Sequence, residues 1–334
     1  EAAWGVGLRT FDSLLSRASI RDFMAFLSKT VAECVCLCLK CIEMLCRCTS
    51  LTGVGSVIIG KPGIGFMISY YLVLFLFVNK EAVPFIKRVG EVKMRVFLLT
   101  AVCAVLVFSG NHGQKITFLD VGQGDGIVVL NGGHAYLIDG GSSSKKNVGS
   151  NVILPYLKYE GVRNIEAVFL SHPDADHVNG AEEILRDCSE IRIAKAVVSG
   201  PIWDMWVEKY PDLPGLLERR KTMINKINTG YRIRDGDIYF TCVYPTNDTS
   251  VTDSNEGSEV LLVEAYGKSF LFTGDLGEEG ERKVAKILMN GDSFKGVTLL
   301  KIGHHGSAHS TCMDFLKAVK PRIAVISVGK NSYG

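Results

Sequence analysis

Four potential metal ligands lie within one short segment, His172-Pro173-Asp174-Ala175-Asp176-His177, directly after the apolar run at 167–170. A strand that ends in such a tight loop brings its polar side chains close to one point. Imidazole nitrogens and carboxylate oxygens are common ligands of divalent cations. The segment therefore predicts a strand that opens into a site for one or two divalent metal ions, with His172, Asp174, Asp176 and His177 as ligands. The alternative is a polar loop whose acids are simply solvated.

From residue 114 onward, short β-rich runs alternate with amphipathic helices. We expect strands at 116–121, 126–130, 135–139, 167–170, 193–198, 238–243, 259–265, 269–273, 298–302 and 323–328. Asn131-Gly132-Gly133 is typical of a hairpin turn. Helices are expected at 150–159, 181–187, 278–289 and 313–319. Early strands followed by mixed strands and helices indicate a layered α/β (α+β) domain.

More polar side chains follow other expected strands. Asp139 and Asp275 each end a strand next to a glycine, where an acid either points into a site or forms a turn. His304 and His305 follow the strand at 298–302. An imidazole titrates in the range in which a group can donate or accept a proton in catalysis. Asp125 either lines the same site or closes a turn.

Four motifs, in family order, resemble the hydrolase domain of the ComEC family, the DNA-uptake channels of naturally competent bacteria. His-x-Asp-x-Asp-His is similar to the His-x-His-x-Asp-His motif of metallo-β-lactamase-fold hydrolases. The others are Phe-Leu-Asp-Val-Gly-Gln-Gly-Asp at 118–125, Leu-Phe-Thr-Gly-Asp at 271–275, and Lys-Ile-Gly-His-His-Gly-Ser at 301–307 followed by 321–334. The resemblance covers residues 115–334 and implies an αββα metallo-β-lactamase-like sandwich.

The resemblance also implies roles for single residues. Asp275 would bridge two metal ions, and Asp139 would orient a ligand from behind. Two such ions polarise a scissile phosphate and lower the pKa of bridging water. Asp176 would then orient or deprotonate that water, and His304 or His305 would protonate the leaving 3′-oxygen or bind the phosphate. Asp125 and Ser307 would line the site.

The sequence departs from the family pattern in three places. Asp174 stands where most members have a second histidine. No histidine lies between His177 and His304, so Asn255 or Glu256 would have to replace the middle ligand. The family pattern continues past Asn-x-Tyr-Gly into His-Pro, whereas this chain stops at Gly334, so we expect a hydrolase domain truncated at its carboxy terminus. The larger share of oxygen ligands favours manganese over zinc.

The first 112 residues have a different character. For the whole chain, a mean hydropathy of +0.20 and 47% apolar residues are high for a wholly soluble enzyme, and the excess is concentrated in this early part. Uncharged runs at 65–78 and 96–110, with their flanks, predict two transmembrane helices near 60–79 and 94–110, and buried core helices are the alternative. We therefore expect the end of a membrane channel region at 1–112 and a hydrolase domain at 113–334. Five basic residues between positions 80 and 95 favour a cytoplasmic loop, which places the hydrolase domain on the outer face.

Cations and aromatic residues are interspersed at 201–234. Cations can follow a phosphate backbone and aromatic faces can stack on bases, which suits single-stranded DNA. The residues that would make these contacts are Trp203, Trp206, Arg219, Arg220 and Lys221. An ordinary solvated helix that covers the fold explains this segment at least as well.

The sequence therefore predicts the carboxy-terminal part of a ComEC-like DNA-uptake protein, with a metal-dependent nuclease that degrades the strand that is not imported. Its expected partners are DNA, the membrane and other proteins of the competence machinery. The net charge of +2 is near neutral and gives no argument for nucleic acid. One alternative is a hydrolase of another phosphodiester, a lactone or a β-lactam. A second is a catalytically inactive module that grips DNA or gates the channel.

Overall fold

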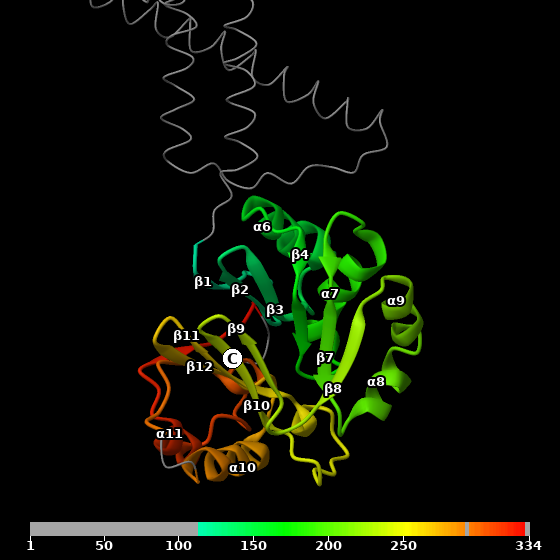
Figure 1. Ribbon diagram of the computed structural model, residues 1–334. Coiled ribbons are helices and arrows are strands. Elements are labelled where there is room, and N and C mark those ends of the chain that lie inside the picture. Colours follow the sequence, from blue (N-terminus) through cyan, green and yellow to red (C-terminus); the bar gives the residue numbers. More distant parts are fainter. Residues whose placement is uncertain (1–112, 291–293, 331–334) are drawn as a thin grey trace, which may run out of the picture. The chain divides into compact units, whose positions relative to one another are not determined.

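The structure is a computed structural model that describes residues 113–290 and 294–330. These residues form two six-stranded sheets, with helices on the outer side of each (Figure 1). The layers are those of the αββα sandwich that the resemblance implied. The transmembrane helices expected near 60–79 and 94–110 lie outside the described residues. Within the described ranges, no helix is long and apolar enough to cross a membrane.

The first sheet has the strand order β1-β2-β3-β5-β7-β8. Antiparallel pairing joins β1 to β2 and β2 to β3, and parallel pairing joins β3, β5, β7 and β8. The strands are β1 (Lys115–Phe118), β2 (Gly126–Asn131), β3 (His134–Gly140), β5 (Ala167–Leu170), β7 (Lys195–Ser199) and β8 (Met223–Ile227). Asn131 pairs with His134 across the turn between β2 and β3, which confirms the expected hairpin. A separate parallel pair consists of β4 (Asn164–Ile165) and β6 (Arg192–Ile193).

The second sheet has the order β14-β13-β12-β11-β10-β9. Its first four strands along the chain are antiparallel, and β12, β13 and β14 are parallel. The strands are β9 (Arg232–Asp235), β10 (Ile238–Tyr244), β11 (Val260–Ala265), β12 (Lys268–Phe272), β13 (Leu299–Lys301) and β14 (Ile323–Val325). Each sheet therefore changes from antiparallel to parallel pairing partway across.

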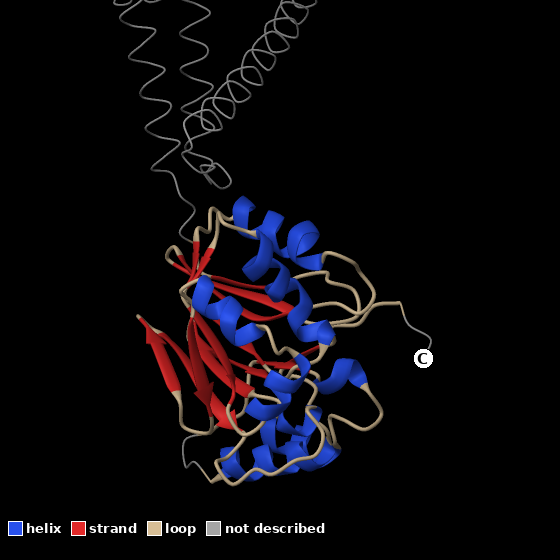
Figure 2. Cartoon of the chain, turned by 90° about the vertical axis from the view of Figure 1, so that its right-hand side faces the viewer, coloured by secondary structure: helices blue, strands red, loops and turns tan. Residues whose placement is uncertain are grey.

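Helices flank both sheets, and Figure 2 shows them on either side of the strands. The first sheet carries η2 (Gly149–Ile153), α6 (Leu154–Tyr159), α7 (Ala175–Asp187), α8 (Trp203–Lys209) and α9 (Leu213–Arg219), and the second carries α10 (Glu278–Met289) and α11 (Met313–Val319). Two short 3-10 turns, η3 (Asn255–Gly257) and η4 (Gly303–Gly306), lie in loops. Apolar side chains of both sheets meet in a central core, where the rings of Phe169 and Phe240 stack at 5.2 Å. Two further cores lie beneath the helices.

The polar motifs of the sequence all lie at the carboxyl ends of strands. Those ends belong to β1, β3 and β5 in the first sheet and to β12 and β13 in the second. In sheets of this kind, ligands bind beyond the carboxyl ends of the parallel strands. The fold therefore brings segments that are far apart in the sequence to one edge of the sandwich.

Candidate metal centre

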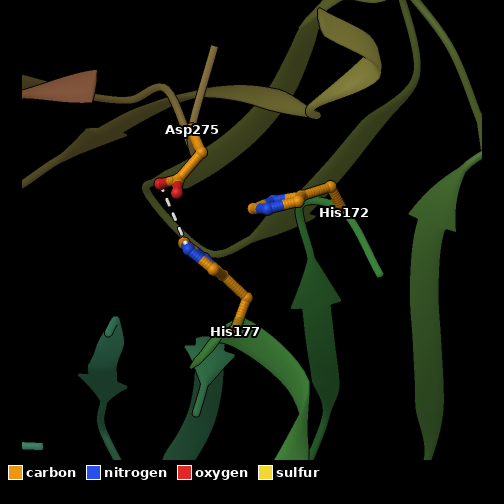
Figure 3. Close-up of side chains that lie close together, drawn as sticks. All are labelled: His172, His177 and Asp275. Carbon is orange, nitrogen blue, oxygen red and sulfur yellow. Dashed lines mark ion pairs between the residues drawn. The ribbon is translucent and has the colours of Figure 1, made fainter. Parts of the chain in front are cut away.

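Loops after three strands, the end of β3 and the first turn of one helix supply the polar side chains of the site. His172 follows β5, Asp275 follows β12, and His305 lies in η4 after β13. His177 lies in the first turn of α7, whose N-cap residue is Asp174. Figure 3 shows the side chains of His172, His177 and Asp275 directed toward one another.

Three imidazole Nε2 atoms surround the carboxylate of Asp275. The Nε2 atom of His177 lies 3.1 Å from Oδ1 of Asp275, and that of His305 lies 3.3 Å from Oδ2. The ring of His172 lies 4.3 Å from the ring of His177, measured between centroids. All three Nε2 atoms are buried, and none makes a hydrogen bond within the described residues. Buried polar atoms without partners are uncommon in folded proteins and call for an explanation, such as a bound ion.

The other ring nitrogen of each histidine is held by a hydrogen bond. Nδ1 of His305 donates to the carbonyl oxygen of Ser327 at 2.8 Å, because a carbonyl can only accept. Nδ1 of His177 lies 2.9 Å from Oδ2 of Asp139, and Nδ1 of His172 lies 3.0 Å from Oγ of Ser171. When Nδ1 donates in this way, Nε2 presents its lone pair, which is the arrangement typical of metal-binding histidines.

Asp139 holds the back of the site. Its carboxylate accepts hydrogen bonds from the Ser171 amide at 2.8 Å and the Ser171 hydroxyl at 2.9 Å, in addition to His177. Burial alone would raise the pKa of Asp139, but the charge and hydrogen bond of His177 keep it below its ordinary value. Its backbone is left-handed, with φ of 51°, which is rare for a residue with a side chain.

Ligand atoms from these residues fall into overlapping groups whose members lie within 4.8 Å of one another. Two of the groups combine histidines with a carboxylate at the Nε2 side of the rings: His172, His177 and Asp275 form one, and Asp176, His177 and His305 form the other. Imidazole nitrogens combined with carboxylate oxygens match the ligand preferences of divalent transition metals. The residues present therefore fit one or two such ions.

Two groups at the mouth of the site are closer to solvent. Asp176 is half-buried, and its Oδ2 lies 3.5 Å from Nε2 of His305. Burial would raise the pKa of Asp176, but contact with His305 and the charge of His177 hold it below the ordinary value. The His304 side chain is 41% exposed, and its Nε2 lies 3.9 Å from Oδ2 of Asp275. Both His304 and His305 have left-handed backbones, so the loop turns sharply there.

A buried lysine that the sequence did not predict, Lys301, offsets the negative charge of the carboxylates in the site. Lys301 is fully buried, donates from Nζ to the Gly274 carbonyl at 2.8 Å, and lies 3.5 Å from Oδ1 of Asp275. It also forms an ion pair with Asp125. Burial alone would lower the pKa of Lys301, but the two carboxylates raise it, so the group stays charged. The one available signal was a lysine that interrupts an apolar run directly before Gly-His-His.

The family model of the metallo-beta-lactamase superfamily matches residues 119–330, which is more than half of the chain. The chain belongs to the metallo-beta-lactamase superfamily. Membership supports a hydrolase that works with divalent metal ions, in agreement with the donor set described above.

Similar proteins from bacteria confirm the resemblance to the ComEC family. The chain is 27% identical over 288 residues to ComE operon protein 3 of Bacillus subtilis, covering 81% of this chain and 35% of that protein. It is 31% identical over 221 residues to Recombination protein 2 of Haemophilus influenzae, covering 65% and 24%. It is 31% identical over 219 residues to Competence protein ComA of Neisseria gonorrhoeae, covering 65% and 28%. The chain thus spans about a quarter to a third of the length of these relatives.

Two residues predicted from the superfamily motifs lie apart from the clustered ligands. Asp174 is in none of the close groups: its Oδ1 binds Nζ of Lys209 at 2.6 Å, and its Oδ2 lies 3.6 Å from Nε2 of His172. Contact with His172, followed by the ion pair with Lys209, lowers the pKa of Asp174. Ser307 donates its amide to the carbonyl of His304 at 2.8 Å, and its Oγ accepts from the next turn, so it closes the loop.

The two residues considered for the missing middle ligand differ in their surroundings. The Glu256 carboxylate accepts a hydrogen bond from the Gly280 amide at 3.1 Å and so faces the start of α10. Asn255 has a buried side-chain oxygen with no hydrogen-bond partner in the described ranges. Ser254 and Glu259, on either side of Asn255, bond to the loop that carries His172. Asn255 is therefore the better placed of the two.

The residues suggested for DNA contacts are not equally available. Trp206 is fully buried in the core beneath the helices and cannot stack on a base, which corrects the prediction for this residue. Arg220 donates to the backbone carbonyls of Cys188 and Ile191, so its guanidinium is engaged within the fold. Trp203 is partly buried, with Nζ of Lys226 4.1 Å from the centre of its ring. Arg219 and Lys221 are exposed.

Proposed function

We propose that the domain is a divalent-metal-dependent deoxyribonuclease that serves the uptake of DNA across a membrane. The observation that carries the proposal is the convergence on Asp275 of three histidines whose buried Nε2 atoms make no hydrogen bond within the described residues. The names of the relatives, which include a competence protein and a recombination protein, support DNA as the substrate. The membrane location, the outer-face orientation and the other competence proteins as partners belong to the same proposal.

Asp275 would bridge two ions, since its Oδ1 faces His177 and its Oδ2 faces His305. His172 and His177 would complete one ion's ligands, and Asp176 and His305 would complete the other's. Asp174 would join His172 if it exchanged its ion pair with Lys209 for the metal. Manganese suits this set better than zinc, because carboxylate oxygens make up a large share of the donors.

Divalent ions held there would polarise the scissile phosphate and lower the pKa of a bound water to near neutrality. Asp176 is ionised at neutral pH because its pKa lies below the ordinary value, so its carboxylate can accept the proton of that water. His304 stands at the mouth, 41% exposed, where it can donate a proton to the leaving 3′-oxygen or bind the phosphate. Asp139 and Ser327 would keep His177 and His305 in the required tautomers.

DNA would approach along the edge of the first sheet that carries the metal centre. Strands β7 and β8 run parallel to β5, so their carboxyl ends share that edge. Trp203 follows β7, Lys226 lies near the end of β8, and Lys209 at the end of α8 reaches Asp174. An aromatic face beside cations suits single-stranded DNA. Lys221 precedes β8, so it lies at the opposite edge of the sheet, about 15–20 Å from the carboxyl end of this strand.

A substrate panel tests the function. The purified 334-residue chain, supplied with Mn²⁺, is offered single-stranded DNA, a small phosphodiester, a lactone and a β-lactam. We expect cleavage of DNA that stops when a chelator is added. Preferential hydrolysis of the lactone or β-lactam would establish another hydrolase. Metal binding and DNA binding without turnover would establish an inactive, DNA-gripping module.

A pair of lysine variants tests the path of the DNA. Lys226→Ala removes a cation at the edge of the metal centre, whereas Lys221→Ala removes one at the opposite edge and serves as the matched control. We expect Lys226→Ala to weaken binding of a single-stranded oligonucleotide and to reduce its salt dependence, because fewer counterions are released. Equal effects of the two substitutions, measured by fluorescence anisotropy, would contradict this path.

A further inference from the structure

One buried acid has no part in the chemistry proposed above. Glu259 lies directly before β11, between the sheets, and is only 3% exposed. Its amide donates to the carbonyl of Ser171 at 2.9 Å, which fixes it beside the loop that leads to His172. Neither of its carboxyl oxygens has a hydrogen-bond partner among the described residues. A buried polar group left in this condition costs about 1–3 kcal/mol, so an apolar side chain would be the simpler choice.

Glu259 faces a small cavity behind the metal centre. The cavity has a volume of about 10 Å³, enough for about one water molecule. Its polar wall consists of Asp125, Asp139, Ser171, Glu259 and Lys301. Both carboxyl oxygens of Asp125 are also buried: Oδ2 forms the ion pair with Lys301, and Oδ1 has no hydrogen-bond partner in the described part of the chain. Two carboxyl groups with unused hydrogen-bonding capacity therefore share one cavity of the size of a water molecule.

The two acids differ in charge. Burial, and after it the negative charge of Asp139, raises the pKa of Glu259 well above its ordinary value, which favours the neutral carboxyl, the form that can donate a hydrogen bond. Asp125 forms an ion pair with Lys301 and, as a carboxylate, can only accept. A water molecule between them can accept from Glu259 and donate to Asp125, which satisfies both groups.

We propose that this cavity binds one internal water molecule and that Glu259, acting through it, is a positioning residue of the metal centre. The link runs from Glu259 through the water to Asp125, and from Asp125 through Lys301 to Asp275. Each group orients the next one, so Glu259 helps to fix the carboxylate of Asp275 between His177 and His305. The inference rests on the proposed metal centre but not on the identity of the substrate.

A purely structural role for Glu259 makes the opposite prediction. Replacement of a buried polar group by an apolar one of similar shape is often neutral or stabilising. Glu259→Leu would then leave Mn²⁺ affinity unchanged and would raise the melting temperature of the metal-free chain. A positioning role requires metal affinity to fall, because groups that support ligands typically contribute about 10–100-fold.

The test compares Glu259→Leu with Glu259→Gln in the 334-residue chain, using calorimetric titration with Mn²⁺ and thermal unfolding of the metal-free protein. We expect Glu259→Leu to bind Mn²⁺ about 10–100-fold more weakly. Glu259→Gln should remain close to wild type, because its amide can donate to the same water. Leu261→Val, which alters an apolar wall of the same cavity, is the matched control and should leave affinity unchanged.

Wild-type affinity in Glu259→Leu, or a loss in Glu259→Gln as large as in Glu259→Leu, would overturn the inference. If Glu259→Leu fails to fold, a crystal structure of the wild-type chain decides: a water within hydrogen-bond distance of Glu259 and Asp125 supports the proposal, and a dry cavity overturns it. DNA cleavage, assayed in parallel, separates this inference from the function. If metal binding depends on Glu259 but DNA is not cleaved, the proposed nuclease function is wrong and the positioning role of Glu259 stands. No metal binding by the wild-type chain would overturn both.

Discussion

Each of the three histidines of the candidate metal centre is oriented by a chemically different acceptor. Ser171 supplies a hydroxyl for His172, Asp139 a carboxylate for His177, and Ser327 a backbone carbonyl for His305. Left-handed backbones at Asp139, His304 and His305 cost of order 1–3 kcal/mol each. Such strain persists where surrounding contacts fix the geometry, and here it is concentrated in the loops that present the ligands.

Metal affinity should depend steeply on pH. Burial alone would lower the pKa of His305, but Asp176 and Asp275 raise it to about 9, and the pKa of His177 is also raised. Metal binding must therefore displace protons, and affinity for Mn²⁺ should rise about tenfold or more per pH unit between pH 6.5 and 9. Titrations at several pH values measure this, and a flat profile would contradict it.

The stability of the metal-free protein should change in the opposite direction. The folded-state pKa of His305 lies above its unfolded value of about 6.5. Its contribution is therefore complete below pH 6.5 and disappears as pH rises through about 9. Thermal unfolding of chelator-treated protein over this range checks the sign.

The sequence predicted the residues of the site whose types suit metals and which stand at strand ends, namely His172, Asp176, His177, Asp275 and His305. It could not predict Lys301 or Glu259. A buried lysine depends on Asp125, which lies in another part of the chain, and a buried glutamate depends on a cavity formed by two sheets. Neither of these long-range contacts produces a recognisable pattern in the neighbouring sequence. Asp174 illustrates the reverse case, because its motif position predicts a ligand while the fold provides Lys209 as an ion-pair partner.

Among the elements, α10 and α11 begin and end where their amphipathic patterns predicted. Helix α7 begins at Ala175 rather than at 181, because the ligand segment itself forms the first turn and the His177 amide donates to the carbonyl of Asp174 at 3.0 Å. Strand β8 was not expected, since its sequence Met-Ile-Asn-Lys-Ile lacks alternation and the strand is largely exposed. An edge strand of this kind is stabilised by pairing with its neighbour, here β7. Its own sequence does not indicate that pairing.

The backbone at Gly141 lies very close to the backbone at the start of α7. A substitution at Gly141 therefore tests whether this contact positions the helix. A Cβ atom at Gly141 would lie 2.4 Å from the carbonyl carbon of Asp176 and 2.5 Å from the amide nitrogen of His177. Gly141→Ala should therefore push the ligand turn away, lower the free energy of unfolding by about 1–3 kcal/mol and weaken metal binding.

The matched control is Gly215→Ala in α9, where the added methyl group meets only the end of the Arg219 side chain at 3.4 Å. Alanine is the better helix former, so this variant should be as stable as wild type or more so. Denaturant unfolding measures both variants. Equal stability and equal metal affinity in Gly141→Ala and wild type would show that α7 is not positioned by this contact.

At the scale of the whole molecule, two sheets with the same change from antiparallel to parallel pairing bring the carboxyl ends of β3, β5, β12 and β13 to one edge. The candidate ligands come from loops of both sheets, so the proposed metal centre depends on the packing of the two sheets against each other. The relatives are three to four times longer than the part they share with this chain, which leaves room for a membrane region in the complete proteins.

The orientation of the hydrolase domain is a separate prediction. The basic loop between positions 80 and 95 should stay in the cytoplasm, and the domain at 113–334 should lie outside. A reporter enzyme that is active only outside the cytoplasm, fused after Gly334 in cells, should therefore be active. Activity from a reporter that works only in the cytoplasm would reverse the topology and remove the case for degrading DNA during uptake.

The central claim is that Asp275 joins the metal ligands of a nuclease. The most direct measurement is the rate of Mn²⁺-dependent cleavage of single-stranded DNA by wild type and by Asp275→Asn, with the exposed Asp237→Asn as the control. Asp275→Asn keeps the shape of the side chain and removes its charge, so we predict a loss of at least about a hundredfold, the upper end for residues that only support ligands. Asp237→Asn should cleave at the wild-type rate. Wild-type cleavage by Asp275→Asn would contradict the account.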